Sequence, residues 1–275
     1  MSLVLFGAAR SCGVTTLVAA LAATWPEGRQ VLVVELDPAG GTLAAASGWP
    51  AEPGLLSLAA AARRGAGPEL VWEHCQALPG GAAILAGPTS AAQAASALAA
   101  LSDLMGRFCE LDADVLVDVG RVGAGPLVLP LVSTARPVVL VSRPQLPDLS
   151  ALANATSSLR TASELGLALV GDGPYRDDEI SDALGVPVLG RLPWDPAAAA
   201  MLTSVPASAR SLRVAPLVRA ARSLADRLGS GASGPPAERS GLVTATGPPR
   251  LRPRAWRSRP ALSGANGSSP DGGSS

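Results

Sequence analysis

Short apolar runs alternate along this chain with Ala- and Leu-rich stretches, and this alternation constrains the fold more than any other feature. The runs are almost continuously apolar, as expected for strands that are buried on both faces. We predict strands at residues 3–6, 31–35, 82–85, 115–119, 138–141, 167–170 and 188–192. We predict helices at residues 15–25, 56–64, 89–109, 146–165 and 177–184. The sequence therefore predicts an α/β fold with a mainly parallel sheet of about seven strands between helices.

A last amphipathic helix is predicted at residues 212–228, where four apolar residues fall on one face. Such a helix can pack on the sheet or bind a membrane surface, and its lack of Phe or Trp anchors favours packing. After it the composition changes to Gly, Ser, Pro and Arg with few apolar residues. We predict a folded domain over residues 1–228 and a disordered tail over residues 229–275.

The overall composition excludes several classes of protein. The 275 residues include 22 basic and 22 acidic side chains, so the formal net charge is zero and gives no general attraction to nucleic acid or anionic lipid. Aromatic residues make up only 3% of the chain, which disfavours modules that stack bases. The three cysteines show no spacing for disulfides or zinc, and no apolar run reaches the ~20 residues that span a bilayer. We expect a cytoplasmic protein.

A turn from Gly7 to Gly13 joins the first predicted strand to the first predicted helix. A P-loop occupies this position in many nucleotide-binding proteins: its backbone N–H groups hold phosphates, a Lys reaches the β- and γ-phosphates, and the next Thr or Ser binds Mg²⁺. Here Thr15 stands in the place of the Mg²⁺ ligand, but Val14 stands in the place of the lysine, and all 22 basic residues are arginines. The turn predicts a phosphate-binding loop without its usual cation; the alternative is an ordinary strand–turn–helix junction with a Thr cap.

Acidic residues follow two further predicted strands. Glu35 and Asp37 come at the end of the second strand, and Asp118 comes at the end of the fourth. Ligands of open α/β sheets bind at the carboxyl ends of the strands, and an Asp after an apolar strand is typical of a Walker-B Mg²⁺ ligand. Thr15, Asp37 and Asp118 would together supply the oxygen ligands that Mg²⁺ prefers. Each Asp taken alone could equally be a helix cap or a turn former.

In these segments the chain resembles the MinD/ParA family of P-loop ATPases, in particular an actinobacterial MinD-like subgroup with a degenerate Walker A loop. The resemblance extends from Leu3 to about Leu202 and rests on G-x-x-x-S-x-G-V-T-T, V-E-L-D-P-A-G-G, V-L-V-D-V-G-R, residues 138–144 and L-G-V-P-V-L-G-R-L-P-W-D. It implies a mainly parallel sheet between helices, ATP and Mg²⁺ as ligands, and a homodimer formed across the nucleotide. Members of this family position chromosomes, plasmids, division septa, flagella or pili.

The resemblance also implies roles for individual residues. Nucleotide contacts would come from Ala9, Arg10, Ser11, Cys12, Gly13, Val14, Thr15 and Thr16. Mg²⁺ would be bound by Thr15, Asp37 and Asp118, and Asp37 would be the catalytic residue that orients the attacking water. Gly120 would be the switch II neighbour of Asp118.

Three departures from the family pattern bear on activity. The P-loop lysine is Val14, the signature lysine aligns with Ala9, and the purine-reading Asn is replaced by Gly171 or Asp172. Phosphoryl transfer depends on positioning and charge stabilisation, so that losing one such group costs roughly 10²–10³ in rate.

Three arginines are candidates for a replacement cation: Arg10, Arg121 and Arg143. A guanidinium can bind phosphate through two parallel hydrogen bonds. Each of the three could instead be an ordinary surface residue.

We therefore predict a nucleotide-binding protein of the chromosome-partitioning or cell-positioning type, with weak or absent ATP hydrolysis. The alternative is a pseudo-ATPase scaffold that recruits a pilus, secretion or division partner without nucleotide. A third hypothesis is a DNA-binding partition protein, because the tail carries a cluster of arginines and one Trp at residues 250–259 that could contact DNA or anionic lipid. Solvated disorder without a partner is the simpler interpretation of that cluster.

Overall fold

The computed structural model describes residues 2–65, 67–78, 81–122, 129–159, 164–203 and 214–230. Within them the sheet has eight strands in the order β3-β4-β2-β5-β1-β6-β7-β8, and only the β3–β4 pair is antiparallel. The strands are β1 (Leu3–Ala8), β2 (Val31–Glu35), β3 (Gln76–Ala77), β4 (Ala83–Leu85), β5 (Asp114–Arg121), β6 (Val138–Ser142), β7 (Leu165–Val170) and β8 (Val188–Leu192). The predicted tail lies outside the described residues, except for Gly229 and Ser230.

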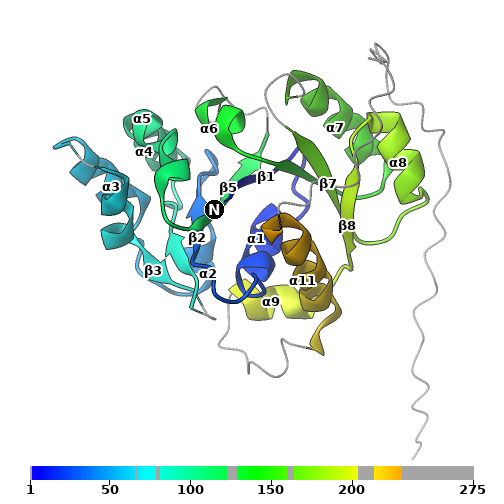
Figure 1. The fold of residues 1–275 in the computed structure, drawn as a ribbon, viewed down its shortest axis with the longest axis horizontal. Coiled ribbons are helices and arrows are strands. Elements are labelled where there is room, and N and C mark those ends of the chain that lie inside the picture. Colours follow the sequence, from blue (N-terminus) through cyan, green and yellow to red (C-terminus); the bar gives the residue numbers. More distant parts are fainter. Residues whose placement is uncertain are drawn as a thin grey trace, which may run out of the picture.

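Helices cover both faces of this sheet (Figure 1). One face carries α1 (Val14–Ala22), α9 (Pro196–Thr203) and α11 (Pro216–Gly229). The other carries α3 (Leu55–Ala62), α4 (Ala91–Ala100), α5 (Ser102–Met105), α6 (Leu129–Thr134), α7 (Leu146–Leu159) and α8 (Asp177–Leu184). Shorter segments are α2 (Leu43–Ala46) and the 3₁₀ helices η1 (Pro68–His74) and η2 (Phe108–Glu110). The prediction of an α/β fold with a mainly parallel sheet between helices is confirmed.

The strand residues divide alternately between two hydrophobic cores. In β1, Leu3 and Leu5 join the core under α4 and α7, whereas Val4 and Phe6 join the core under α1 and α11. Both faces of the strand are therefore buried in apolar cores, which explains why continuous apolar runs, rather than alternating ones, marked the strands in the sequence.

Two predicted helices differ from the observed elements. The stretch 89–109 is not one helix, because the backbone departs from α-helical values at Leu101 and around Gly106 and Arg107; Met105 and Phe108, next to these breaks, are fully buried. The stretch 146–165 ends earlier than predicted: α7 stops at Leu159, and Leu165 is already a strand residue that pairs with Val138.

Several short elements were not predicted. Strand β3 has only two residues and pairs with β4, so it is too short to show alternation and the sheet has eight strands instead of about seven. Helix α9 had a signal that sequence reasoning passed over: Asp195 caps the Ala198 amide at 3.0 Å, and Pro196 occupies the first helical position.

The last helix, α11, packs on the protein as predicted. Its buried face consists of Leu217, Val218, Ala221, Leu224, Ala225 and Leu228. This face lies against α1 and β8 (Figure 1). None of the helices in the described ranges is both long and apolar enough to cross a membrane.

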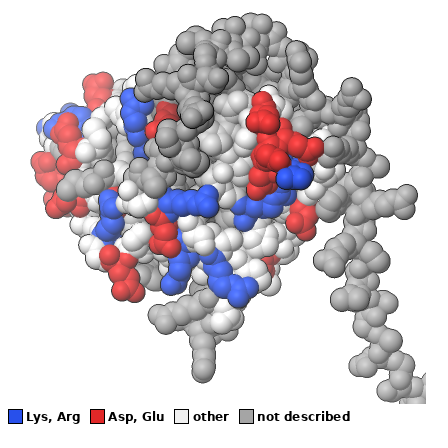
Figure 2. Space-filling model, turned by 45° about the vertical axis from the view of Figure 1, so that its right-hand side comes forward, with Lys and Arg blue, Asp and Glu red and all other residues white. Residues whose placement is uncertain are grey.

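Charges of both signs are interspersed on the face drawn in Figure 2, in line with the zero formal net charge. The described part of that face therefore offers no single-sign surface of the kind that binds a phosphate backbone.

Candidate functional site

The predicted phosphate-binding loop runs from the end of β1 to the start of α1. Gly13 caps α1 with a left-handed backbone (φ 94°), which glycine adopts without strain, and no side chain caps this helix end. The amide N–H groups of the first helical turn are thus open to an anion. Val14, in the lysine position, is buried in the core beneath α1.

Thr15 and Asp118 meet at the base of this loop. The Thr15 hydroxyl donates a hydrogen bond to Asp118 Oδ2 at 2.6 Å, and the Gly120 amide donates to Asp118 Oδ1 at 2.8 Å. Asp118 is only 1% exposed, and burial raises its pKa to about 6 in spite of these two bonds. The negative charges of Glu35 and Asp37 raise that pKa further. Within the described residues this carboxylate is therefore hydrogen-bonded and forms no ion pair.

Asp37 lies beside Gly120, the residue whose amide donates to Asp118. Its Oδ1 accepts a hydrogen bond from the Ala39 amide at 2.8 Å, and a Cβ at residue 120 would collide with the Asp37 carboxylate. Gly120 also has a left-handed backbone (φ 60°), so glycine is required there on two grounds. The structure thus brings Thr15, Asp118 and Asp37, which lie far apart in the sequence, to one edge of the sheet.

Glu35 is a component of the site to which sequence reasoning gave no separate role. It is buried, and its carboxylate accepts hydrogen bonds from the amides of Thr42, Leu43 and Gly87 at 2.9, 3.0 and 3.2 Å. Burial raises the pKa of Glu35 as well. These bonds tie the segment after Asp37 to the end of β4, and the sequence signal was an acid at the last position of a buried strand.

The remaining loop residues have different surroundings. Ala9 is half-buried and packs against the core on the α7 side. Arg10 is exposed and lies 3.8 Å from Asp148 on α7. Ser11 accepts a hydrogen bond from Arg121 Nη2 at 3.1 Å.

A cavity of about 220 Å³ adjoins the loop on its α11 side. It is lined mostly by apolar groups, among them Leu17 of α1 and Leu217 of α11, while Thr16 and Ser11 form its edge towards the loop. Trp194, which is 62% exposed, borders the cavity, and the Arg143 guanidinium lies 5.2 Å from the centre of its ring. A flat apolar group fits such a space.

Gly171 and Asp172, the expected replacements for the purine-reading Asn, do not line this cavity. Gly171 follows β7, and a Cβ placed there would lie 3.6 Å from Trp194 Cβ.

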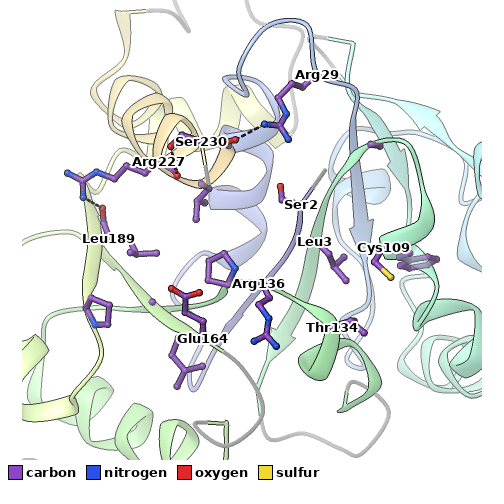
Figure 3. A pocket seen from close by; sticks show the side chains of 18 residues that line it. Ser2, Leu3, Arg29, Cys109, Thr134, Arg136, Glu164, Leu189, Arg227 and Ser230 are labelled. Atoms are coloured by element: carbon purple, nitrogen blue, oxygen red, sulfur yellow. Dashed lines mark hydrogen bonds between the residues drawn. The ribbon is translucent and has the colours of Figure 1, made fainter. Parts of the chain in front are cut away.

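A larger cavity, of about 630 Å³, lies at the opposite edge of the sheet, where β1, β6 and β7 begin (Figure 3). Two of its arginines are already engaged: Arg29 donates to the Gly229 carbonyl at 2.6 Å, and Arg227 donates to the Leu189 carbonyl at 2.6 Å. None of the predicted site residues lines it. We therefore place the candidate site at the loop and not at this cavity.

Cys12 is a buried residue of the loop. Its thiol donates a weak hydrogen bond to the Val141 carbonyl at 3.0 Å, and burial raises its pKa to about 12. We expect iodoacetamide at pH 8 to modify the exposed Cys109 of the native protein and to leave Cys12 unmodified, as read by peptide mass spectrometry. Equal modification of both before unfolding would contradict this packing of the loop.

Neither protein-family models nor curated proteins give a match to this chain. Solved structures do. A ParA family ATPase from Chlorobium tepidum TLS has a TM-score of 0.68 at 19% identity, covering 82% of this chain and 99% of its own. The septum site-determining protein MinD of Pyrococcus horikoshii, complexed with Mg-ADP, has a TM-score of 0.64 at 17% identity, covering 85% and 99%.

A third similar structure has a different activity in its name. Cobyrinic acid a,c-diamide synthase of Mycobacterium smegmatis, with a bound ATP analogue and magnesium, has a TM-score of 0.56 at 19% identity, covering 83% of this chain and 94% of its own. At such identities the likeness establishes the fold and leaves the reaction open.

The mainly parallel sheet, with a glycine-containing loop between β1 and α1, has the arrangement of a P-loop α/β fold. More narrowly, the chain has the MinD/ParA-like P-loop ATPase fold, as its sequence motifs predicted.

Proposed function

We propose that this chain is a MinD/ParA-like protein that binds ATP with Mg²⁺ and hydrolyses it slowly or not at all. In this proposal it works in the cytoplasm, as a homodimer with a further protein partner, in chromosome partitioning or cell positioning. The observation that carries the proposal is the part-buried Thr15–Asp118 hydrogen bond beside a helix N-terminus that has no side-chain cap.

The donor chemistry of the site suits a magnesium nucleotide. Among the described residues no group of three His, Cys, Asp or Glu side chains could hold a metal by itself. A hydroxyl, one or two carboxylates and open coordination positions for water and phosphate oxygens are what Mg²⁺ prefers. Asp118, with its raised pKa, would be stabilised in its charged form by such a cation.

The proposed roles follow from the positions of the side chains. Thr15 and Asp118 would hold Mg²⁺, the open amides at the start of α1 would hold phosphate, and Asp37 would orient a water molecule. Bound MgATP would supply the transferable phosphoryl group and the charge that compensates it. Val14 contributes no charge to this site, which supports slow or absent turnover.

The competing proposal is a scaffold that keeps the fold and recruits a pilus, secretion or division partner without nucleotide. It is favoured by the loss of both lysines, at Ala9 and Val14. DNA or membrane contact by the tail is a further proposal, on residues outside the described ranges.

We expect 1 mM MgATP to raise the melting temperature of the full chain in a thermal shift assay. A ligand at a hundredfold its Kd stabilises a protein by about 2.7 kcal/mol. Chelation of Mg²⁺ should reverse most of the shift, and Thr15→Val should reduce it because the hydroxyl is lost while the side-chain volume is kept.

Arg107→Gln is the matched control, because Arg107 is exposed and lies near η2 at the opposite edge of the sheet. Absence of any shift at 1 mM MgATP, confirmed by calorimetry, would leave only the scaffold proposal.

A further inference from the structure

Neither lysine position of the loop holds a cation. Val14 is buried among the apolar residues beneath α1, and Ala9 packs on the other core. Arg10 is the one basic residue of the loop, and it is placed beside Asp148 of α7. Among the described residues, the other candidate cations are Arg121 and Arg143, which lie at the ends of the neighbouring strands β5 and β6.

An irregularity in β5 directs one arginine to the loop. Phe6 of β1 pairs with Asp118 of β5. Ala8 comes two residues after Phe6, but its partner, Arg121, comes three residues after Asp118. The extra residue in β5 is accommodated next to Gly120, and such bulges re-aim the side chains that follow them. Without the bulge, Asp118 and Arg121 would point to opposite faces of the sheet; with it, they share the face that carries α1.

The resulting position of Arg121 is at the mouth of the loop. Its Nη2 donates to Ser11 Oγ at 3.1 Å, and no carboxylate in the described ranges forms an ion pair with it. A guanidinium has five N–H donors in a planar fork, and the Ser11 bond uses one. Within the described ranges Ser11 is its one hydrogen-bond partner, and the remaining donors have the geometry to bind phosphate oxygens in pairs. Arg143, in contrast, lies against the Trp194 ring.

We propose that Arg121 binds the phosphate groups of the ligand and supplies the positive charge that Val14 cannot. The Ser11 hydroxyl holds the guanidinium over the loop amides before the ligand arrives. This inference rests on the proposed function, since it assigns a phosphate-binding residue to that same site.

The test is calorimetric titration of MgATP and of AMP into the full chain and its variants. Arg121→Gln should weaken MgATP binding by about ten- to a hundredfold, the range for hydrogen bonds to charged groups. AMP binding should weaken by less than about threefold, because its single phosphate lies nearest the sugar and makes fewer contacts with the guanidinium. Arg121→Lys should retain part of the MgATP affinity, since the charge remains but the fork is lost.

Arg107→Gln again serves as the control for removal of an exposed arginine, and thermal melts verify that each variant folds. If Arg121→Gln binds MgATP within about twofold of the unmodified chain, or loses MgATP and AMP affinity equally, Arg121 is not the phosphate ligand, although the proposed function would stand. If the unmodified chain binds no MgATP, the proposed function itself fails, and this inference fails with it.

Discussion

Replacing Asp118 by asparagine is expected to make the protein more stable at pH 8 while removing its Mg²⁺-dependent affinity for nucleotide. The carboxylate is 1% exposed and its pKa is raised to about 6, so holding it ionised opposes folding. A rise of about two pKa units corresponds to about 3 kcal/mol, and the loss of one acceptor for Thr15 or Gly120 offsets about 1 kcal/mol of it, so we expect a gain of about 1–2 kcal/mol in the free energy of unfolding.

The pH dependence of the folding stability follows from the raised pKa of Asp118. Because the folded state holds the Asp118 proton more tightly than the unfolded state, it binds more protons between about pH 4 and pH 6, and the stability of the unmodified chain falls as the pH rises through that interval. The advantage of Asp118→Asn should accordingly be small at pH 4 and complete by pH 7. Urea unfolding at pH 4, 6 and 8 measures this advantage. If the difference in free energy of unfolding between Asp118→Asn and the unmodified chain falls from pH 4 to pH 8, the raised pKa of Asp118 is contradicted.

Replacing Asp114 by alanine should have the opposite and larger effect on stability, a loss of about 3–5 kcal/mol at pH 7. Asp114 stands at the other end of β5 and is also 1% exposed. It accepts hydrogen bonds from the Trp25 indole at 2.8 Å, the Ser2 amide at 2.7 Å and Arg29 Nη2 at 2.7 Å. Its removal leaves these donors without their acceptor and loosens the end of α1 from the sheet.

The Asp114 and Asp118 variants are controls for one another. Hydrogen bonds from Trp25, Ser2 and Arg29 lower the pKa of Asp114, so its contribution is present at neutral pH and is lost as the pH falls through the acid range. The deficit of Asp114→Ala should therefore shrink on acidification, measured by the same urea series. A deficit below about 1 kcal/mol at pH 7 would mean that the network around Trp25 and Arg29 is not needed for stability.

The sequence predicted those parts of the fold that depend on hydrophobic pattern. Continuous apolar runs at Leu3, Val31 and Val138 marked strands buried on both faces, and the loop and acids were expected at the carboxyl ends of strands, which a parallel sheet brings to one edge. The breaks in the predicted helix 89–109, at Leu101 and around Gly106, were not predictable. Met105 and Phe108 beside them are buried in the tertiary core, and local helix propensity does not describe such packing.

At the candidate site, the sequence showed which residue types are present but not where their side chains point. The sequence named Arg10, Arg121 and Arg143 as equal candidates for a cation, and only the bulge at Gly120 and the Asp148 contact distinguish them. Glu35 was visible as an acid, but the three amides it binds come from segments that only the folded chain brings together. A hydrogen-bond network of this kind has no signature in a single sequence.

The burial of Val14 has a consequence for how this chain can change. A lysine at this position would have to bring a charged end and four methylenes into space that a branched hydrocarbon now fills, or push that end out past the glycine cap. Val14→Lys alone is therefore not expected to place a cation in the loop: the core under the first helix would have to be repacked as well.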